Sequence, residues 1–360
     1  MNTPPPRRIL IVRLSAIGDI VMASGLISAL RSIWPDSHIA WLAEKGPADL
    51  LKTNPLLDEV IELPRRHWKK MSREGQRIEA NREMLAFSKT LKMKSFDLVL
   101  DLQGLLKSGI WAWATRAPRR IGLGSREGSQ WLMTETYPRN QTDPRMGKEY
   151  RALAVHLGAS DESFVPHIGI PESVQATARR LLGKDQDTSR KIALLAPFTT
   201  RPQKHWFTDQ WLGLAQRLDE AGFDCVILGG PDDAPQAEEM IQASSSTIRS
   251  LTGKTSLLES AALIETGDLL IGVDTGLTHM GMASTTPTVA LFGSTLPYWE
   301  TRSARAEILY TQEPCSPCHR RPSCNGHFTC MRHHSADTVF RAVLRVMAST
   351  GEHPDRKDVE

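Results

Sequence analysis

Short apolar segments alternate with segments of helical length along the whole chain. The apolar segments fall at residues 9–14, 38–42, 59–63, 97–102 and 120–123, and again at 192–196, 225–228, 248–251, 269–273 and 288–292. Helix-length segments lie between or after them, at 20–33, 105–115, 146–157, 207–221, 234–243, 257–265 and 277–283. Strands that are apolar throughout are typical of parallel sheets buried on both faces. The pattern therefore predicts an α/β fold with two parallel sheets covered by helices.

The two series of strands are separated by residues 164–172, where two prolines and a glycine interrupt both periodicities. We therefore expect one Rossmann-like domain over residues 1–168 and a second over residues 169–335. A last helix-length segment follows the second series of strands. We expect this C-terminal part, residues 336–360, to return to the first domain as a helix.

The composition is that of a globular protein, because 40% of the 360 residues are hydrophobic and 24% are charged. This length suits two domains of ordinary size. No apolar run approaches the roughly 18 residues that cross a bilayer, and the first residues are rich in proline and arginine. We therefore expect a cytoplasmic protein.

Charge is distributed unevenly, although the net charge is only +3. Residues 1–185 contain 28 Lys and Arg against 20 Asp and Glu, whereas the remainder contains 16 against 21. Residues 65–94 alone hold ten basic and three acidic residues. Such a segment favours an anionic partner, since charges act over roughly 8 Å at physiological salt; a solvated helix face is the alternative. Because the second half is acidic, we expect no nucleic-acid partner.

The first candidate for chemistry is the turn after the first strand, which contains Ser15 and Asp19. In an open α/β sheet, ligands bind outside the carboxyl ends of the strands, where this turn lies. Asp19 suits a general base, and it equally suits a cap on the following helix. The turn lacks the Gly-x-Gly-x-x-Gly and P-loop fingerprints, which disfavours NAD-dependent enzymes and P-loop NTPases.

Two further turns follow strands of the second half. In the earlier one, Thr199, Thr200 and Lys204 offer hydroxyl donors and a positive charge suited to a diphosphate; turn capping and a solvated lysine are the alternative. In the later one, Asp274 precedes a helix whose first backbone amides would point at an anion. His279 lies one turn into that helix and suits either a phosphate contact or a core position.

Four of the five cysteines crowd near the C-terminus, at Cys315, Cys318, Cys324 and Cys330. A reducing compartment argues against a disulfide framework. Four thiolates so close in sequence suit a structural zinc ion or an iron–sulfur cluster. Reduced thiols without a metal are the alternative, because the gaps differ from the paired motifs of zinc ribbons.

Together these segments resemble glycosyltransferase family 9, the ADP-heptose:lipopolysaccharide heptosyltransferases. The resemblance covers nearly the whole chain and is carried by the order and spacing of four segments, at residues 15–19, 101–108, 199–206 and 274–279. It implies a GT-B fold, in which two Rossmann-like domains with parallel sheets face a central cleft. It also implies an inverting transfer from ADP-L-glycero-D-manno-heptose that requires no metal and no other cofactor.

The resemblance also implies roles for individual residues. Asp19 corresponds to the family's proposed catalytic carboxylate. The residues that correspond to donor-binding positions are Thr199, Thr200, Lys204, Asp232, Asp274, Thr275, Gly276, Leu277 and His279. Asp232 stands where heptosyltransferase I enzymes have a glutamate that holds the ribose, and Thr255 where they have a methionine near adenine. The nucleobase pocket therefore departs from the family's pattern.

On the acceptor side, the basic segments resemble those with which heptosyltransferase I enzymes hold Kdo-lipid A. The acceptor-binding candidates are Ser15, Arg65, Arg66, Lys69 and Arg126. The C-terminal cysteine pattern resembles other members, so a heptosyltransferase II-type transfer to a heptose acceptor stays open. A GT-B enzyme using another sugar nucleotide and a non-catalytic nucleotide-binding protein stay open as well. Kdo-lipid A or a related anionic glycolipid as acceptor implies a peripheral position at the cytoplasmic membrane surface, on the inner face of the inner membrane.

Overall fold

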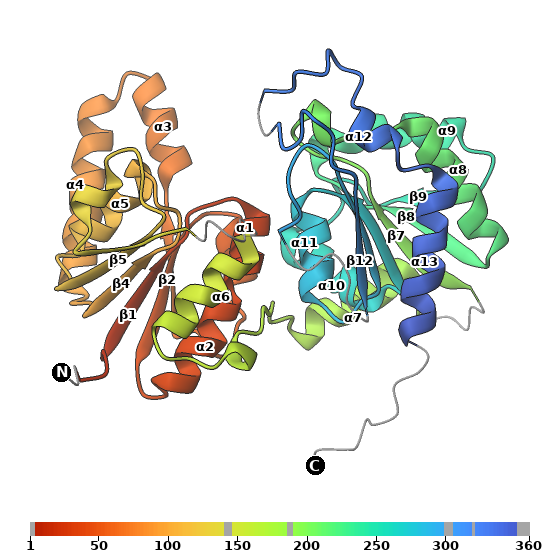
Figure 1. Ribbon diagram of the computed structural model, residues 1–360. Helices are drawn as coiled ribbons and strands as arrows, with labels where there is room; N and C mark the ends of the chain where they lie inside the picture. The colour runs from red at the N-terminus through yellow and green to blue at the C-terminus, as the bar shows by residue number, and fades with distance from the viewer. Residues whose placement is uncertain (1–3, 140–145, 186–189, 299–304, 319–320, 351–360) are drawn as a thin grey trace. The chain divides into compact units, whose positions relative to one another are not determined.

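The structure, a computed structural model, describes residues 4–139, 146–185, 190–298, 305–318 and 321–350. The chain divides into two compact units, Met1–Gly169 and Ile170–Glu360. We expected the division after residue 168. Each unit is a parallel sheet with helices on both faces (Figure 1), as the apolar pattern predicts.

The sheet of the first unit has six parallel strands. In spatial order they are β3 (Glu59–Leu63), β2 (His38–Glu44), β1 (Arg8–Val12), β4 (Leu98–Asp101), β5 (Arg119–Leu123) and β6 (Glu135–Tyr137). β1 lies between β2 and β4, with Val12 opposite both Leu42 and Asp101. Because all the strands run in the same direction, their carboxyl ends meet at one edge, and the turns that follow them share it.

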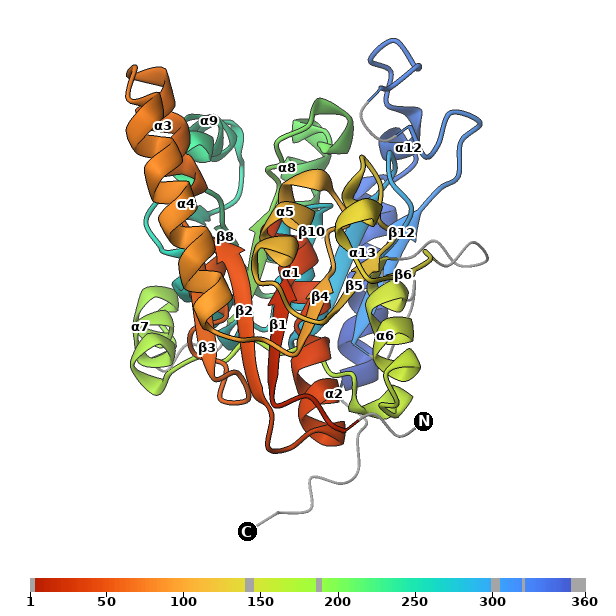
Figure 2. The same ribbon diagram turned by 90° about the vertical axis from the view of Figure 1, so that its left-hand side faces the viewer.

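Helices cover both faces of this sheet. One face carries α1 (Ile17–Ala23), α2 (Gly25–Ile33) and α6 (Met146–His156), and the other carries α3 (Arg65–Arg73), α4 (Arg77–Met93) and α5 (Leu106–Ala114) (Figures 1 and 2). The short 3-10 helices are η1 (Pro47–Leu50), η2 (Ser129–Leu132) and η3 (Asp161–Ser163). Leu10 and Val12 of β1 pack with Trp68 of α3 and Leu91 of α4 in a buried core. This core fixes the α3–α5 layer on the sheet.

The second unit repeats the strand order of the first. Its sheet runs β9 (Ile248–Ser250), β8 (Phe223–Ile227), β7 (Lys191–Ala196), β10 (Leu269–Val273), β11 (Thr288–Phe292) and β12 (Ala306–Tyr310). In both units the first strand is central and the order is that of a Rossmann sheet. The helices are α7 (Glu172–Leu182), α8 (Thr208–Glu220), α9 (Ala234–Ala243), α10 (Leu257–Thr266), α11 (Gly276–Ala283), α12 (Thr329–Arg332) and α13 (Ala336–Thr350), with η4 (Pro202–Lys204) and η5 (Pro231–Asp233). Within the described ranges, no helix combines the length and apolar character that a membrane span requires.

The C-terminal helix α13 packs on the second unit, so our expectation of a return to the first unit was wrong for residues 336–350; residues 351–360 lie outside the described residues. Its apolar face, including Val339, Val343 and Val346, is buried in the same core as Trp211 of α8. Arg345 adds a paired contact to Glu307 of β12, with N–O distances of 2.9 and 2.7 Å. The helix therefore covers a face of the second sheet that would otherwise expose apolar side chains.

Candidate active site

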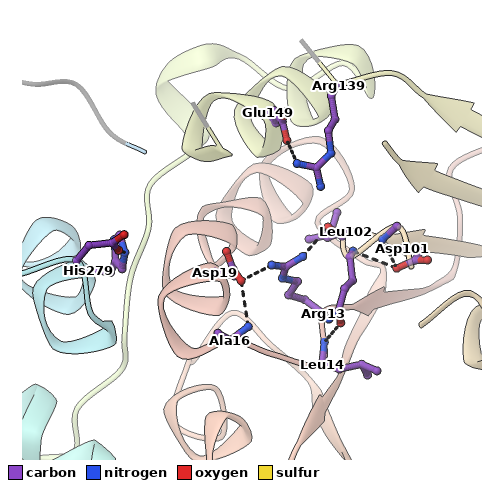
Figure 3. Close-up of polar contacts among 12 residues, drawn as sticks. Arg13, Leu14, Ala16, Asp19, Asp101, Leu102, Arg139, Glu149 and His279 are labelled. Carbon is purple, nitrogen blue, oxygen red and sulfur yellow. Dashed lines mark hydrogen bonds and ion pairs between the residues drawn. The ribbon is translucent and has the colours of Figure 1, made fainter. Parts of the chain in front are cut away.

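The turn that follows β1 positions Asp19 at the start of α1. Asp19 is the third residue of this helix, and its Oδ2 accepts a hydrogen bond of 3.0 Å from the backbone amide of Ala16. The same oxygen forms an ion pair with the Arg13 guanidinium (Figure 3). The side chain keeps 22% of its surface exposed. Asp19 therefore caps the helix and also presents a carboxylate to solvent, so the two roles considered from the sequence are compatible.

Arg13 lies buried behind this carboxylate, with only 5% of its surface exposed. Its Nη1 donates a hydrogen bond of 3.0 Å to the backbone oxygen of Leu102. The centre of the guanidinium lies 6.0 Å from the centre of the Tyr150 ring. A planar guanidinium held from several sides has little freedom, so it fixes the oxygen of Asp19 that it contacts. Arg13 interrupts an apolar segment of the sequence, and we did not predict a role for it.

The end of β4 supplies a second buried network at the same edge of the sheet. Asp101 accepts hydrogen bonds from the amides of Gln103 and Gly104, at 3.1 and 3.2 Å, and from the Ser108 hydroxyl at 3.0 Å. Burial raises the pKa of Asp101 to about 6, against the lowering effect of these hydrogen bonds. Gly104 has a φ of +63°, and a Cβ there would collide with a backbone oxygen of β5. The Gln103 side chain accepts a hydrogen bond of 3.1 Å from the amide of Leu14. This network therefore holds the turn that carries Asp19.

Three of the predicted acceptor-binding residues belong to α3, which begins just after β3. Arg66 and Lys69 line a partly open hollow with Lys70, Arg73 and Glu74. Arg65 instead forms an ion pair of 3.0 Å with Glu44, at the end of β2. The hollow thus gathers four cations against one carboxylate, which favours an anionic ligand.

The other two acceptor-binding candidates lie in turns after β1 and β5. Ser15 is half-buried beside Asp19 in sequence, and Arg126 is exposed. The backbone amide of Arg126 donates a hydrogen bond of 2.9 Å to the oxygen of Gly104, which ties its turn to the Asp101 network. The structure thus brings the candidates of the first unit to the carboxyl edge of one sheet.

In the second unit, the buried carboxylate of Asp274 organises the predicted donor-binding residues. Its Oδ2 forms an ion pair with Lys204 and accepts a hydrogen bond of 2.5 Å from the Thr295 hydroxyl. Its Oδ1 lies 3.3 Å from Nε2 of His279. Burial alone would raise the pKa of Asp274, but the hydrogen bond with His279 and the charge of Lys204 hold it well below its ordinary value. Asp274 is therefore an ionised anchor that orients Lys204, and not a proton acceptor at neutral pH.

The remaining donor-binding candidates surround this anchor in the chain. Thr199 and Thr200 follow β7 in the turn that leads to η4 and Lys204, and His205 contacts the Thr199 backbone oxygen at 2.8 Å. Thr275 is the N-cap of α11, so the first amides of the helix, Gly276 and Leu277, have no partner within the helix.

His279 is buried, and its ring lies 5.5 Å from the ring of Tyr298 and 6.3 Å from that of Phe292. From the sequence, His279 suits either a phosphate contact or a position in the core. The structure favours the core, with Nε2 of His279 directed at Asp274. Asp232 is exposed in η5, whereas the neighbouring Asp233 accepts a hydrogen bond of 2.8 Å from the amide of Gly230. Asp233 is thus occupied in capping, whereas the Asp232 side chain is exposed to solvent.

Sequence reasoning did not identify Thr295, which belongs to this site by structure. It follows β11, whereas Asp274 follows β10, and the two strands are neighbours in the sheet. Parallel order therefore brings the two turns together across twenty-one residues of chain. Ligands bind outside the carboxyl ends of parallel strands, and Thr295 lies at that end of β11. A single threonine without a motif, however, does not indicate a site from the sequence alone.

Among the residues that the structure describes, the C-terminal cysteines are not gathered into a metal centre. Cys315, Cys318 and Cys324 are half-buried and Cys330 is buried, and all four thiols are free. Burial raises the pKa of Cys330 to about 11 and also raises the pKa of Cys318, so both thiols are protonated at neutral pH when no metal is bound. In the part of the chain that the structure describes, no three Cys, His, Asp or Glu residues are arranged to hold a metal ion.

Known proteins resemble this chain over most of its length. Residues 84–329 match the family model described as glycosyltransferase family 9 (heptosyltransferase). The chain is 29% identical over 317 residues to lipopolysaccharide heptosyltransferase 1 of Pseudomonas aeruginosa. The aligned residues cover 86% of each protein. Further relatives of 24 to 28% identity are named heptosyltransferase 2 and heptosyltransferase 3.

Solved structures share the fold. A family 9 glycosyltransferase from Veillonella parvula matches with a TM-score of 0.78 at 22% identity, over 95% of this chain and 97% of that one. The Escherichia coli heptosyltransferase WaaC, solved with ADP-2-deoxy-2-fluoro heptose, matches with a TM-score of 0.70 at 22% identity, over 94% and 99%. With two Rossmann sheets of the same order, these matches establish a GT-B fold.

Proposed function

The chain belongs to glycosyltransferase family 9, the heptosyltransferases, and we propose that it transfers L-glycero-D-manno-heptose from ADP-heptose to the Kdo-lipid A inner core of lipopolysaccharide. One observation carries this proposal. The carboxylate of Asp19 is partly exposed and is held by Arg13 and the amide of Ala16. It lies at the same edge of the first sheet as the start of α3, whose cations line a hollow. A base and an anion-binding surface at one edge suit an acceptor that is both a nucleophile and an anion.

The second unit binds the donor in this proposal. Lys204 and the first amides of α11 meet the diphosphate, and the hydroxyls of Thr199 and Thr200 donate further hydrogen bonds. Asp274 orients Lys204 through their ion pair, and Asp232 takes the ribose. The complex of the relative WaaC with an ADP-heptose analogue supports this choice of donor.

The transfer then proceeds by direct displacement. Ala16 and Arg13 both contact Oδ2 of Asp19, so we assign proton acceptance to Oδ1. The acceptor hydroxyl gives its proton to this oxygen, forms a bond to the anomeric carbon and displaces the β-phosphate oxygen of ADP with inversion. Lys204 and the amides of Gly276 and Leu277 stabilise the charge that develops on the leaving diphosphate. No metal or other cofactor takes part.

The cationic surface of α3 holds the anionic groups of the acceptor. In this proposal Arg65, Arg66 and Lys69 of α3 contact its carboxylates and phosphates, together with Arg126 in the turn after β5. Ser15, in the turn after β1, also contacts the acceptor. Because that acceptor is a lipid, we place the protein in the cytoplasm, peripherally attached to the inner face of the inner membrane. A second candidate, transfer to a heptose already on the core, is supported by one relative, named lipooligosaccharide heptosyltransferase 2.

Mass spectrometry of the products distinguishes these transfers. The purified chain is incubated with ADP-heptose and either Kdo-lipid A or the same lipid already carrying one heptose. We expect one heptosyl residue to be added to Kdo-lipid A and none to the heptosylated lipid. Addition only to the heptosylated lipid would assign the second transfer. A parallel series with ADP-glucose and UDP-glucose tests the donor, and faster transfer from either would contradict ADP-heptose as substrate.

A further inference from the structure

Exposed apolar side chains gather on one side of the first unit. The described residues include eleven large hydrophobic side chains that are exposed, and seven of them lie on α4, α5 and η2. These seven are Ile78, Leu85 and Met93 of α4, Leu106, Ile110 and Trp113 of α5, and Trp131 of η2. The other four are scattered over both units. A concentration of this kind marks an interaction surface, because single exposed apolar residues are normally dispersed.

The three residues of α4 form one stripe along the helix. Ile78, Leu85 and Met93 are seven and eight residues apart, which places them on the same side at about 100° per residue. Their exposed fractions are 78%, 66% and 75%. The opposite side of the helix is buried through Ala80 and Leu91. The stripe is therefore not a core face, and α4 is apolar on two opposite sides.

The apolar residues of α5 form a second stripe beside the first. Leu106, Ile110 and Trp113 are four and three residues apart, the spacing of one helix face, and α5 contacts α4 (Figure 2). η2 lies against the other flank of α5, where a Cβ added to Gly109 would come within 3.0 Å of Ser129. η2 carries Trp131, which is 83% exposed. The seven side chains thus lie on one outer surface, which we call the α4–α5 face.

Positive charge surrounds these apolar side chains. Residues 65–94 hold ten basic and three acidic residues, and residues 105–118 hold two basic residues and no acidic one. On α4, Arg82, Lys89 and Lys92 are exposed among the apolar positions. The guanidinium of Arg116 lies 3.7 Å from the centre of the Trp113 ring. The α4–α5 face therefore combines apolar side chains with an excess of cations.

We propose that the α4–α5 face docks on a bilayer that contains anionic lipids. Apolar side chains enter the interface between headgroups and acyl chains, tryptophan rings settle at headgroup depth, and lysine and arginine reach the lipid phosphates. Each cation near an anionic surface adds to this attraction. A second copy of the chain does not fit this face, because a symmetric contact would oppose two surfaces of the same charge.

The proposed function includes a lipid acceptor, and this inference adds the surface that would approach the membrane containing that lipid. It rests on the proposed function only for the identity of that membrane. The docking itself follows from the surface and is measured without any transfer reaction. Sedimentation with vesicles of phosphatidylcholine containing about one third phosphatidylglycerol measures it directly. We expect the parent chain to bind these vesicles, and to bind vesicles of pure phosphatidylcholine more weakly.

The test variant replaces the most exposed apolar residues of the α4 stripe and η2, as Ile78→Ser, Leu85→Ser and Trp131→Ser together. The matched control makes three similar changes at exposed apolar positions outside the α4–α5 face, as Leu56→Ser, Val155→Ser and Leu344→Ser. We expect the test variant to bind the anionic vesicles at least about tenfold more weakly than the parent, and the control to match the parent. A charge variant, Arg82→Ser, Lys89→Ser and Lys92→Ser, is expected to show a weaker preference for phosphatidylglycerol than the parent.

Vesicle binding by the test variant at the parental level would overturn the proposal, as would a parent chain that does not bind the anionic vesicles. Self-association of the parent that the test variant abolishes would also overturn it, because the face would then be an interface between copies. A soluble, deacylated acceptor separates this proposal from the proposed function. If the parent binds vesicles but transfers no heptose to that acceptor or to the lipid, the function fails and the docking surface stands.

Discussion

The Arg13 guanidinium forms an ion pair with the Asp19 carboxylate, although Arg13 belongs to a buried segment and Asp19 to a partly exposed helix start. The contact joins the core of the first sheet to the residue that we propose as the base. Because Ala16 contacts the same oxygen, the orientation of the carboxylate is fixed before any substrate binds. Preorganisation of this kind removes the need to orient the base during the reaction.

Replacement of Arg13 tests this positioning. We expect Arg13→Gln to lower kcat roughly ten- to hundredfold, because a small misplacement of the base has effects of that size, while the KM for ADP-heptose stays unchanged. Arg13→Lys keeps the charge and should recover part of kcat. Steady-state kinetics on both variants, with circular dichroism to verify folding, make the comparison. Parental kcat in Arg13→Gln would show that Asp19 needs no such support.

Lys204 is the cation that we propose meets the donor diphosphate. A hydrogen bond to a charged group contributes about 1.5–3 kcal/mol, so Lys204→Ala should weaken ADP binding roughly ten- to hundredfold and lower kcat as well. Lys191→Ala is the matched control, since Lys191 is an exposed lysine at the opposite end of β7. Calorimetry with ADP measures the affinities. Equal affinities for the parent and Lys204→Ala would move Lys204 out of the donor site.

Asp101 should make folding stability depend on pH. Burial raises its pKa from an ordinary 3.8 to about 6, so the folded state keeps a proton that the unfolded state loses near pH 4. The stability that this proton provides is complete below about pH 4 and is lost as the pH rises to about 6, by an amount on the order of 3 kcal/mol. Asp101→Asn should lack this loss. Urea unfolding at several pH values measures the free energy of unfolding of the parent and of Asp101→Asn. The same pH dependence of this free energy in both proteins would contradict the raised pKa of Asp101.

The cations of α3 should act on the acceptor alone. Replacement of Arg65, Arg66, Lys69 and Lys70 by serine is expected to raise the KM for Kdo-lipid A and to reduce its dependence on salt, because screened surface charge acts most at low ionic strength. The KM for ADP-heptose should not change. A control with Arg180, Lys191, Lys254 and Arg341 replaced by serine removes the same charge from the second unit. Equal acceptor kinetics in both variants at low salt would make α3 a solvated face.

The central strands could be predicted from the sequence because they are apolar on both sides. The edge strands β6 and β12 could not, since β6 is only three residues long with two of them exposed, and β12 is half-buried. The charged helices α3 and α4 appeared only as a basic segment, because cations hide the apolar positions that pack on the sheet. The partner of α13 was missed for another reason. An amphipathic pattern shows that a helix has a buried face, and not which sheet covers it.

The candidate site could be predicted where a motif follows a strand, as with Asp19, Lys204 and Asp274. The contacts of these residues could not be predicted, because they depend on which strands are neighbours in the sheet. Thr295 contacts Asp274 because β10 and β11 are neighbours in the sheet, and Arg13, the residue after β1, contacts Asp19 at the start of α1. Both are positioning residues without a motif of their own, and single-sequence reasoning has no signal for them.

The turnover of Asp19→Asn tests the central claim, that the chain transfers heptose with Asp19 as its base. With ADP-heptose and Kdo-lipid A, we expect kcat to fall by about 10²- to 10⁴-fold, the usual contribution of a general base. ADP affinity should stay within about tenfold of the parent, because only proton transfer is removed. Asp36→Asn, at an exposed aspartate before β2, should retain the parental kcat. An Asp19→Asn variant that turns over as fast as the parent would contradict the account.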